Sequence, residues 1–122
     1  NFVFFNDGTR IPIETALKTL CELVDQMKSV SDQLLPALID EIHVLAKMIL
    51  KTDPQNHQSL FALAKIERVA GSKALASEYL AVCIDFYSDQ KLEYVRTLME
   101  WANEDGNLAL AGAIKQKYGV LA

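Results

Sequence analysis

The chain has 122 residues, of which 51% are hydrophobic and 23% charged, and its formal net charge is −4. This balance is typical of a folded domain that buries its own core, and it is not that of a disordered chain. The twelve Lys and Arg residues are scattered among sixteen Asp and Glu, so no basic stripe marks a nucleic-acid or anionic-lipid surface. Because no apolar run is long enough to cross a bilayer, we also expect no membrane insertion.

Two cysteines, Cys21 and Cys83, each lie in an apolar helical stretch. We expect both to be buried thiols that pack as small hydrophobic groups, since two cysteines alone do not make a disulfide framework. The first five residues contain neither a basic region nor a cleavage motif of a signal peptide, which favours a cytoplasmic location.

Residues 1–12 differ in pattern from the rest of the chain. Residues 2–5 are a β-prone run of Phe and Val, residues 6–8 (Asn-Asp-Gly) are a turn signal, and residues 9–13 can return as a second strand. Two alternatives stay open, a small hairpin or an extended segment packed on the helices. Either way the apolar side chains need cover, from the core or from a second copy of the chain in a homodimer. The candidates for such self-association are Phe2, Phe4 and Phe5.

Residues 13–51 predict a pair of helices. From Ile13 to Val30 apolar residues recur every three or four positions, which predicts an amphipathic helix. Ser31-Asp32 breaks this pattern, and Pro36 suits the first turn of a second helix that reaches about Leu50 with a broad apolar face.

Four more helices follow between residues 53 and 119. Thr52-Asp53-Pro54 ends the second helix, and we expect Asp53 to cap the third. The later boundaries are marked by glycines and capping residues: Gly71, Ser72, Ser88-Asp89, Gly106, Asn107 and Gly119. Short loops make successive helices antiparallel, so we predict an all-α domain, a stack of about six helices over residues 13–122.

The second half of the sequence repeats itself. Gly71 and Gly106 are separated by as many residues as Ala76 and Ala111, and each pair stands in the same helix–turn–helix context. The matching residues across one unit, 53–87, are Pro54, Leu60, Leu63, Ala64, Gly71, Ala76, Leu80 and Cys83. With these residues the unit resembles a tetratricopeptide repeat (TPR), which implies an α-solenoid.

The resemblance is incomplete. Glu67 stands where the family prefers a large residue, and Ser88 stands where a trailing proline is common. Residues 88–119 resemble a degenerate terminal repeat, with Met99, Lys115 and Tyr118 at positions that are usually small or apolar. Residues 13–51 do not fit the repeat pattern, and a non-repetitive helical bundle of similar helix lengths is the alternative.

The sequence carries no motif for chemistry. His43 and His57 are expected to be exposed on helix surfaces, and neither they nor the cysteines have metal-ligand spacing. The glycines are isolated at helix ends rather than gathered in a phosphate loop. We therefore predict no catalytic residues, no metal, no cofactor and no enzymatic activity, with Tyr79 and Trp101 packing between helices.

The resemblance implies a concave groove lined by the first helix of each repeat. Carried over position by position, the groove residues would be Gln58, Phe61, Lys65, Arg68, Glu93, Arg96 and Glu100. Such a mixed-charge surface suits a peptide or partner helix, although the basic cluster by which some family members hold a terminal carboxylate is not reproduced. Two hypotheses follow: an adaptor that binds a protein or peptide, or a structural domain that self-associates through its N-terminus.

Overall fold

The computed structural model describes residues 1–86 and 91–119, and within them the chain forms six helices and one two-stranded sheet. The strands are β1 (Phe2–Phe4) and β2 (Arg10–Pro12). The helices are α1 (Ile13–Gln26), α2 (Leu35–Thr52), α3 (His57–Val69), α4 (Lys73–Phe86), α5 (Lys91–Glu104) and α6 (Leu108–Tyr118). The predicted all-α stack is therefore confirmed, while the start predicted at Ser88-Asp89 lies outside the described residues. No described helix is both long enough and apolar enough to cross a membrane.

The N-terminal segment is a hairpin, the first of the two alternatives. Val3 pairs with Ile11 in the antiparallel register, and the turn is held by the Asp7 carboxylate, which accepts hydrogen bonds from Thr9 N (2.9 Å) and Thr9 Oγ1 (2.7 Å). Gly8 supplies the left-handed backbone of the turn, with φ of 88°. Because strand side chains alternate in direction, Val3 is fully buried against the helices while its neighbours face outward.

Two helix boundaries differ from the prediction. Helix α1 ends at Gln26, and the chain continues to Val30 in tighter turns such as Met27 N to Val24 O (3.2 Å). Helix α3 is capped by Asn56, whose Oδ1 accepts from Ser59 N and Ser59 Oγ at 2.9 Å each. Asp53 was the wrong cap because the helix begins at His57, so an acceptor at position 56 reaches the third helical N–H.

The cap predicted for α6 is confirmed. Asn107 Oδ1 accepts from Leu110 N at 3.0 Å, and Gly106, with φ of 66°, makes the turn that precedes it. Both residues act through local backbone geometry, which explains why sequence alone could locate them.

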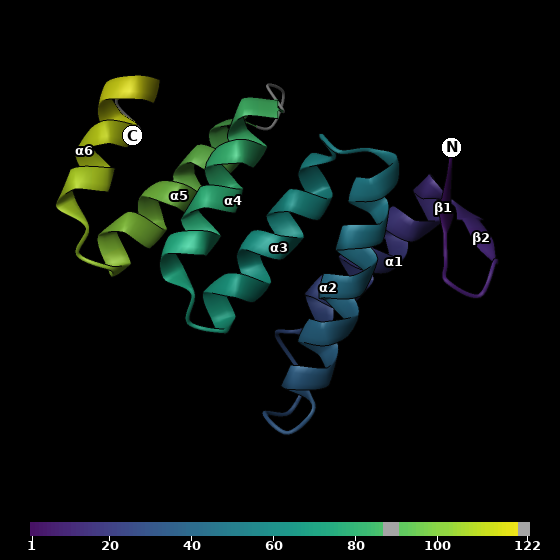
Figure 1. Cartoon of the computed structure of the whole chain (residues 1–122). Coiled ribbons are helices and arrows are strands. Elements are labelled where there is room, and N and C mark those ends of the chain that lie inside the picture. Colours follow the sequence, from purple (N-terminus) through teal and green to yellow (C-terminus); the bar gives the residue numbers. More distant parts are fainter. Residues whose placement is uncertain (87–90, 120–122) are drawn as a thin grey trace.

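The helices form a row in which each packs on the next (Figure 1). The hairpin lies beside α1 and α2 at one end, and α6 lies at the other. Helix α1 also packs on α3, so α1, α3 and α5 share one face of the stack. This face carries the candidate site.

The buried side chains form two hydrophobic cores that meet at α3. The first core joins the hairpin, α1, α2 and one side of α3, including Leu63 and Ile66. The second joins the opposite side of α3 with α4, α5 and α6. Ala64 and Ala76, both fully buried, lie in the second core, where small residues let α3 and α4 approach closely. Helix α3 is thus buried on two sides, and its remaining side faces the groove described next.

Candidate functional site

A groove runs along α3 between α1 and α5. It consists of two adjoining cavities, one of about 190 Å³ and one of about 420 Å³. Both are lined by Val24 of α1, by Phe61 and Lys65 of α3, and by Glu93 of α5, so they form one feature, which we call the α3 groove. Its lining mixes apolar and charged side chains.

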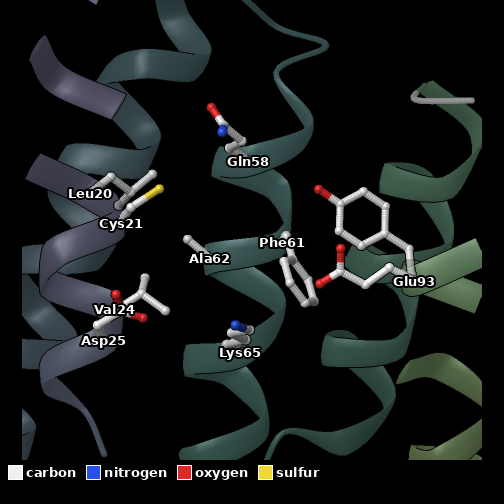
Figure 2. Close-up of a pocket in the computed structure, with 10 residues that line it drawn as sticks. Leu20, Cys21, Val24, Asp25, Gln58, Phe61, Ala62, Lys65 and Glu93 are labelled. Carbon is white, nitrogen blue, oxygen red and sulfur yellow. The ribbon is translucent and has the colours of Figure 1, made fainter. Parts of the chain in front are cut away.

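Helix α3 is the floor of this groove, and α1 and α5 are its walls. Figure 2 shows the α1 wall, where Cys21 and Asp25 follow one another down the helix beside α3, and the α3 positions Gln58, Ala62 and Lys65 in the same order. Helices α1 and α3 therefore run in the same direction. Among the described residues, no Cα atom of α5 comes within 8 Å of a Cα atom of α3, so only side chains close that side.

The first link between α3 and α5 is aromatic. The rings of Phe61 and Tyr94 lie 4.8 Å apart between centroids at 57°, and the Tyr94 hydroxyl shares a hydrogen bond of 2.6 Å with His57 Nδ1. Next to them the Cys83 thiol donates to the His57 carbonyl at 3.2 Å, which adds α4 to the contact. Tyr94 is buried, and the cluster anchors α5 on α3 near the start of both helices.

Burial in this cluster changes the acid–base behaviour of two groups. Desolvation lowers the pKa of His57 below the usual 6.5, with Asp53 opposing the shift. Burial raises the pKa of Cys83 to about 12, so the thiol is protonated at neutral pH. Cys83 is buried as predicted, whereas the predicted exposure of His57 is wrong, because Tyr94 covers the imidazole and leaves it half-buried.

The second link is ionic and lies at the other end of α3. The Arg68 guanidinium donates to Asp105 Oδ2 at 2.6 Å and to Glu104 Oε2 at 2.9 Å, and it lies 5.2 Å from the centroid of the Trp101 ring. The hydrogen bond from Arg68 and its positive charge keep the pKa of the Asp105 carboxyl below its usual range. The side chain predicted to contact a partner is therefore engaged in holding the end of α5.

Lys65 lies between these two clusters, and its ammonium group contacts an aromatic ring rather than a carboxylate. Its Nζ sits 4.3 Å from the centroid of the Phe61 ring, and it forms no ion pair with any residue that the structure describes. Burial lowers the pKa of Lys65, Lys28 lowers it further, and Asp25 and Glu93 oppose these effects. Lys65 is thus a half-buried cation that bonds to no carboxylate within the described part of the chain.

The structure brings together five of the seven predicted partner-binding residues. Gln58, Phe61, Lys65, Arg68 and Glu93 line the α3 groove. Arg96 and Glu100 are exposed but line neither cavity, because α5 turns Glu93, Tyr94, Thr97 and Trp101 toward the groove.

The α1 wall is the part that sequence reasoning missed. Cys21, Val24, Asp25 and Lys28 line the groove at the spacing of one helical face. The repeat resemblance did not extend to this helix, and Cys21 was predicted to be buried, which is wrong: its side chain is exposed in the groove wall. A polar and charged stripe beside the buried stripe of α1 was the available signal.

The residues predicted for self-association lie on the hairpin, away from the groove. Phe2 and Phe4 face outward, with Phe4 62% exposed, and the Arg10 guanidinium lies 4.7 Å from the centroid of the Phe2 ring. Phe5 is half-buried and lines a separate apolar cavity of about 450 Å³ between the hairpin, α1 and α2. The three phenylalanines therefore do not form one patch.

Residues 1–86 and 91–119 contain no group of three or more His, Cys, Asp or Glu side chains placed to hold a metal ion. Comparison with protein-family models, with curated proteins and with solved structures finds no match to this chain.

Proposed function

We propose that the chain is a TPR-like interaction module that binds a peptide or partner helix of another protein in the α3 groove. The observation that supports this proposal is the groove itself, which follows α3 and is walled by two further helices. Its lining combines apolar surface at Val24, Phe61 and Trp101 with a few charged groups, a combination that suits peptide recognition.

The acid–base state of the neighbouring groups also favours binding over catalysis. A nucleophilic cysteine needs a lowered pKa and a base within reach. Cys83 has a pKa raised to about 12, and its thiol donates to the carbonyl of His57 rather than to the imidazole. The imidazole itself is engaged with the Tyr94 hydroxyl.

A site-specific crosslinking experiment tests the proposed groove. A photoreactive amino acid is placed at Gln58, inside the groove, and at Glu78, exposed on α4, in cells that produce the protein naturally. We expect a crosslinked partner from position 58 and none from position 78. The crosslink should weaken when Phe61→Ala is added, because that change removes an aromatic contact surface.

Equal yields from both positions, or a crosslink from position 58 that is undiminished by Phe61→Ala, would contradict the groove as binding surface. Circular dichroism of each variant provides the folding control, since Phe61 also touches Tyr94.

Self-association through the outer face of the hairpin is a second candidate function. It is favoured by the exposure of Phe2 and Phe4 on one side of β1. Light scattering on the full chain and on Phe4→Ser tests it, because Phe4 is exposed and its replacement spares the buried Val3. A dimer that becomes monomeric in the variant supports this function, and an unchanged mass contradicts it.

A further inference from the structure

We infer that the segment bound in the α3 groove is an amphipathic helix of about three turns that places one side-chain carboxylate between Lys65 and Lys28. This inference rests on the proposed function and specifies the occupant of the same groove. Three properties of the groove carry it: its length and direction, the state of its backbone, and the charges at one of its ends.

The length of the groove along α3 matches that of a short helix. Its lining along α3 extends from Gln58 to Val69, which corresponds to roughly 16 Å of helix axis. In the described parts of the chain, no Cα atom of α1 lies within 8 Å of a Cα atom of α5, so the two helices flank α3 on separate sides. A helix laid over α3 therefore packs against three neighbours and buries an apolar stripe on Val24, Phe61 and Trp101.

The backbone of the groove favours a helical occupant over an extended one. An extended segment needs external partners for its N–H and C=O groups, as when it adds to a sheet edge. All three elements that line the groove are helices, whose internal N–H and C=O groups are already paired with one another. A helix satisfies its own backbone, so it needs only the side-chain contacts that this groove offers.

The charges at one end of the groove call for an acidic side chain. Lys28, Lys65 and Arg68 line the larger cavity together with one carboxylate, Glu93. Arg68 is neutralised by Glu104 and Asp105, which leaves Lys28 and Lys65 without an ion pair among the described residues.

Lys65 is also prepared for such a contact. Its ammonium lies over the Phe61 ring in a partly desolvated position, where the cost of removing it from water has already been met on folding. A carboxylate that arrives there gains a charge-assisted hydrogen bond and relieves the repulsion between the two lysines. The opposing walls carry Asp25 and Glu93, which exclude a second carboxylate nearer the start of α3.

Selection from a displayed library of helical peptides about four turns long tests this inference. The library varies the positions of one helix face and is selected on the full chain, on Lys65→Glu, and on Lys18→Glu as a matched control. Lys18 is exposed on α1 and does not line the groove. We expect binders of the full chain and of Lys18→Glu to share an Asp or Glu at one position, and binders of Lys65→Glu to carry Lys or Arg there.

Resynthesised peptides give the size of the effect. Changing the selected acidic residue to its amide should weaken binding to the full chain about tenfold to a hundredfold, and should weaken binding to Lys65→Gln by a clearly smaller factor, because only Lys28 remains there. Circular dichroism shows whether each variant is folded, and Lys65→Gln keeps the test decisive should Lys65→Glu fail to fold.

Several results would overturn the inference. These are binders without a shared acidic position, an acidic position that survives Lys65→Glu, and binders that tolerate proline within the peptide. Loss of binding on amidation of the peptide C-terminus would assign the carboxylate to the chain end instead. If position 58 still crosslinks to a partner in these cases, the groove remains the proposed binding surface. Only the inference that its occupant is an acidic helix is then refuted.

Discussion

The two halves of the molecule hold their helices together by different means. In the first core, α1 packs directly on α3, and the buried side chains are aliphatic, such as Leu20, Ile42 and Ile49. In the second core, α5 is attached to α3 through an aromatic cluster at Tyr94 and an ion-pair cluster at Arg68. One wall of the groove is therefore fixed by close helix packing, whereas the other is positioned by long side chains.

Helix α3 connects these two arrangements because it contributes side chains to both cores. Leu63 and Ile66 point into the first, and Leu60 and Ala64 point into the second. We therefore expect the halves to unfold together, although their contacts respond to different conditions.

Leu63→Ala should lower the free energy of unfolding by about 2–5 kcal/mol, because it leaves a cavity in the first core at a fully buried position. Urea unfolding should be followed both by circular dichroism and by the fluorescence of Trp101, the only tryptophan, which lies in the second core. We expect both signals to shift together.

A Trp101 transition that does not shift would show that the cores unfold independently and would break the proposed coupling through α3. Leu108→Ala is the matched control, since Leu108 is 82% exposed and the same change there should alter stability little.

Ala76→Leu should cost about 1–3 kcal/mol by overpacking, because Ala76 is fully buried where α4 lies close to α3. Ala74→Leu, at an exposed position of the same helix, is the control. Thermal unfolding of both variants measures the difference. A neutral Ala76→Leu would contradict the close approach of α3 and α4 at Ala76.

Tyr94→Phe should cost about 0.5–1.5 kcal/mol, because it removes the hydroxyl that bonds to His57 and keeps the ring that touches Phe61. His57 also predicts a pH dependence. Its pKa is lower in the folded chain than the usual 6.5, so the unfolded chain binds the proton more readily and stability is lost as the pH falls below that value.

This loss should be absent in His57→Gln, measured by urea unfolding between neutral and mildly acidic pH. A wild-type protein whose stability does not change over this interval would contradict the burial of His57.

Arg68→Gln should have the smallest effect at neutral pH and low salt, since ion pairs near the surface contribute little. The difference in stability between the wild type and the variant should depend on pH in the acidic range. The pKa of Asp105 is held below 3.8 in the folded chain, so the stabilisation by Arg68 is complete above that pH and disappears as the pH falls through the lowered value. The melting temperatures of the wild type and the variant should therefore converge in strong acid. They should also converge at high salt, and a gap that persists under both conditions would exclude the ion pairs as its cause.

Much of the fold could be predicted because local rules determine it. The Asn-Asp-Gly turn, the glycine at position 106 and the cap at Asn107 act within a few residues of chain. Asp53 and Asn56 are both residue types that commonly cap helices. Asn56 is the cap because α3 begins at His57, a boundary that the local sequence does not determine.

The site was predicted less completely because it depends on how helices face one another. The predicted α3 positions all line the groove, since the register of one helix follows from its own apolar pattern. The predicted α5 residues Arg96 and Glu100 do not line the groove. Tyr94 and Trp101 pack against α3, and they determine which face of α5 is turned toward the groove. No sequence pattern indicates that Arg68 pairs with Asp105, a turn residue beyond the next two helices.

The side-chain attachment of α5 also gives the molecule a mechanical property. A contact between helix backbones is stiff, whereas a pair of links such as Tyr94 with His57 and Arg68 with Asp105 can change length through side-chain rotation. We therefore expect any bending of the stack to concentrate between α3 and α5, where side chains rather than close backbone packing join the two helices.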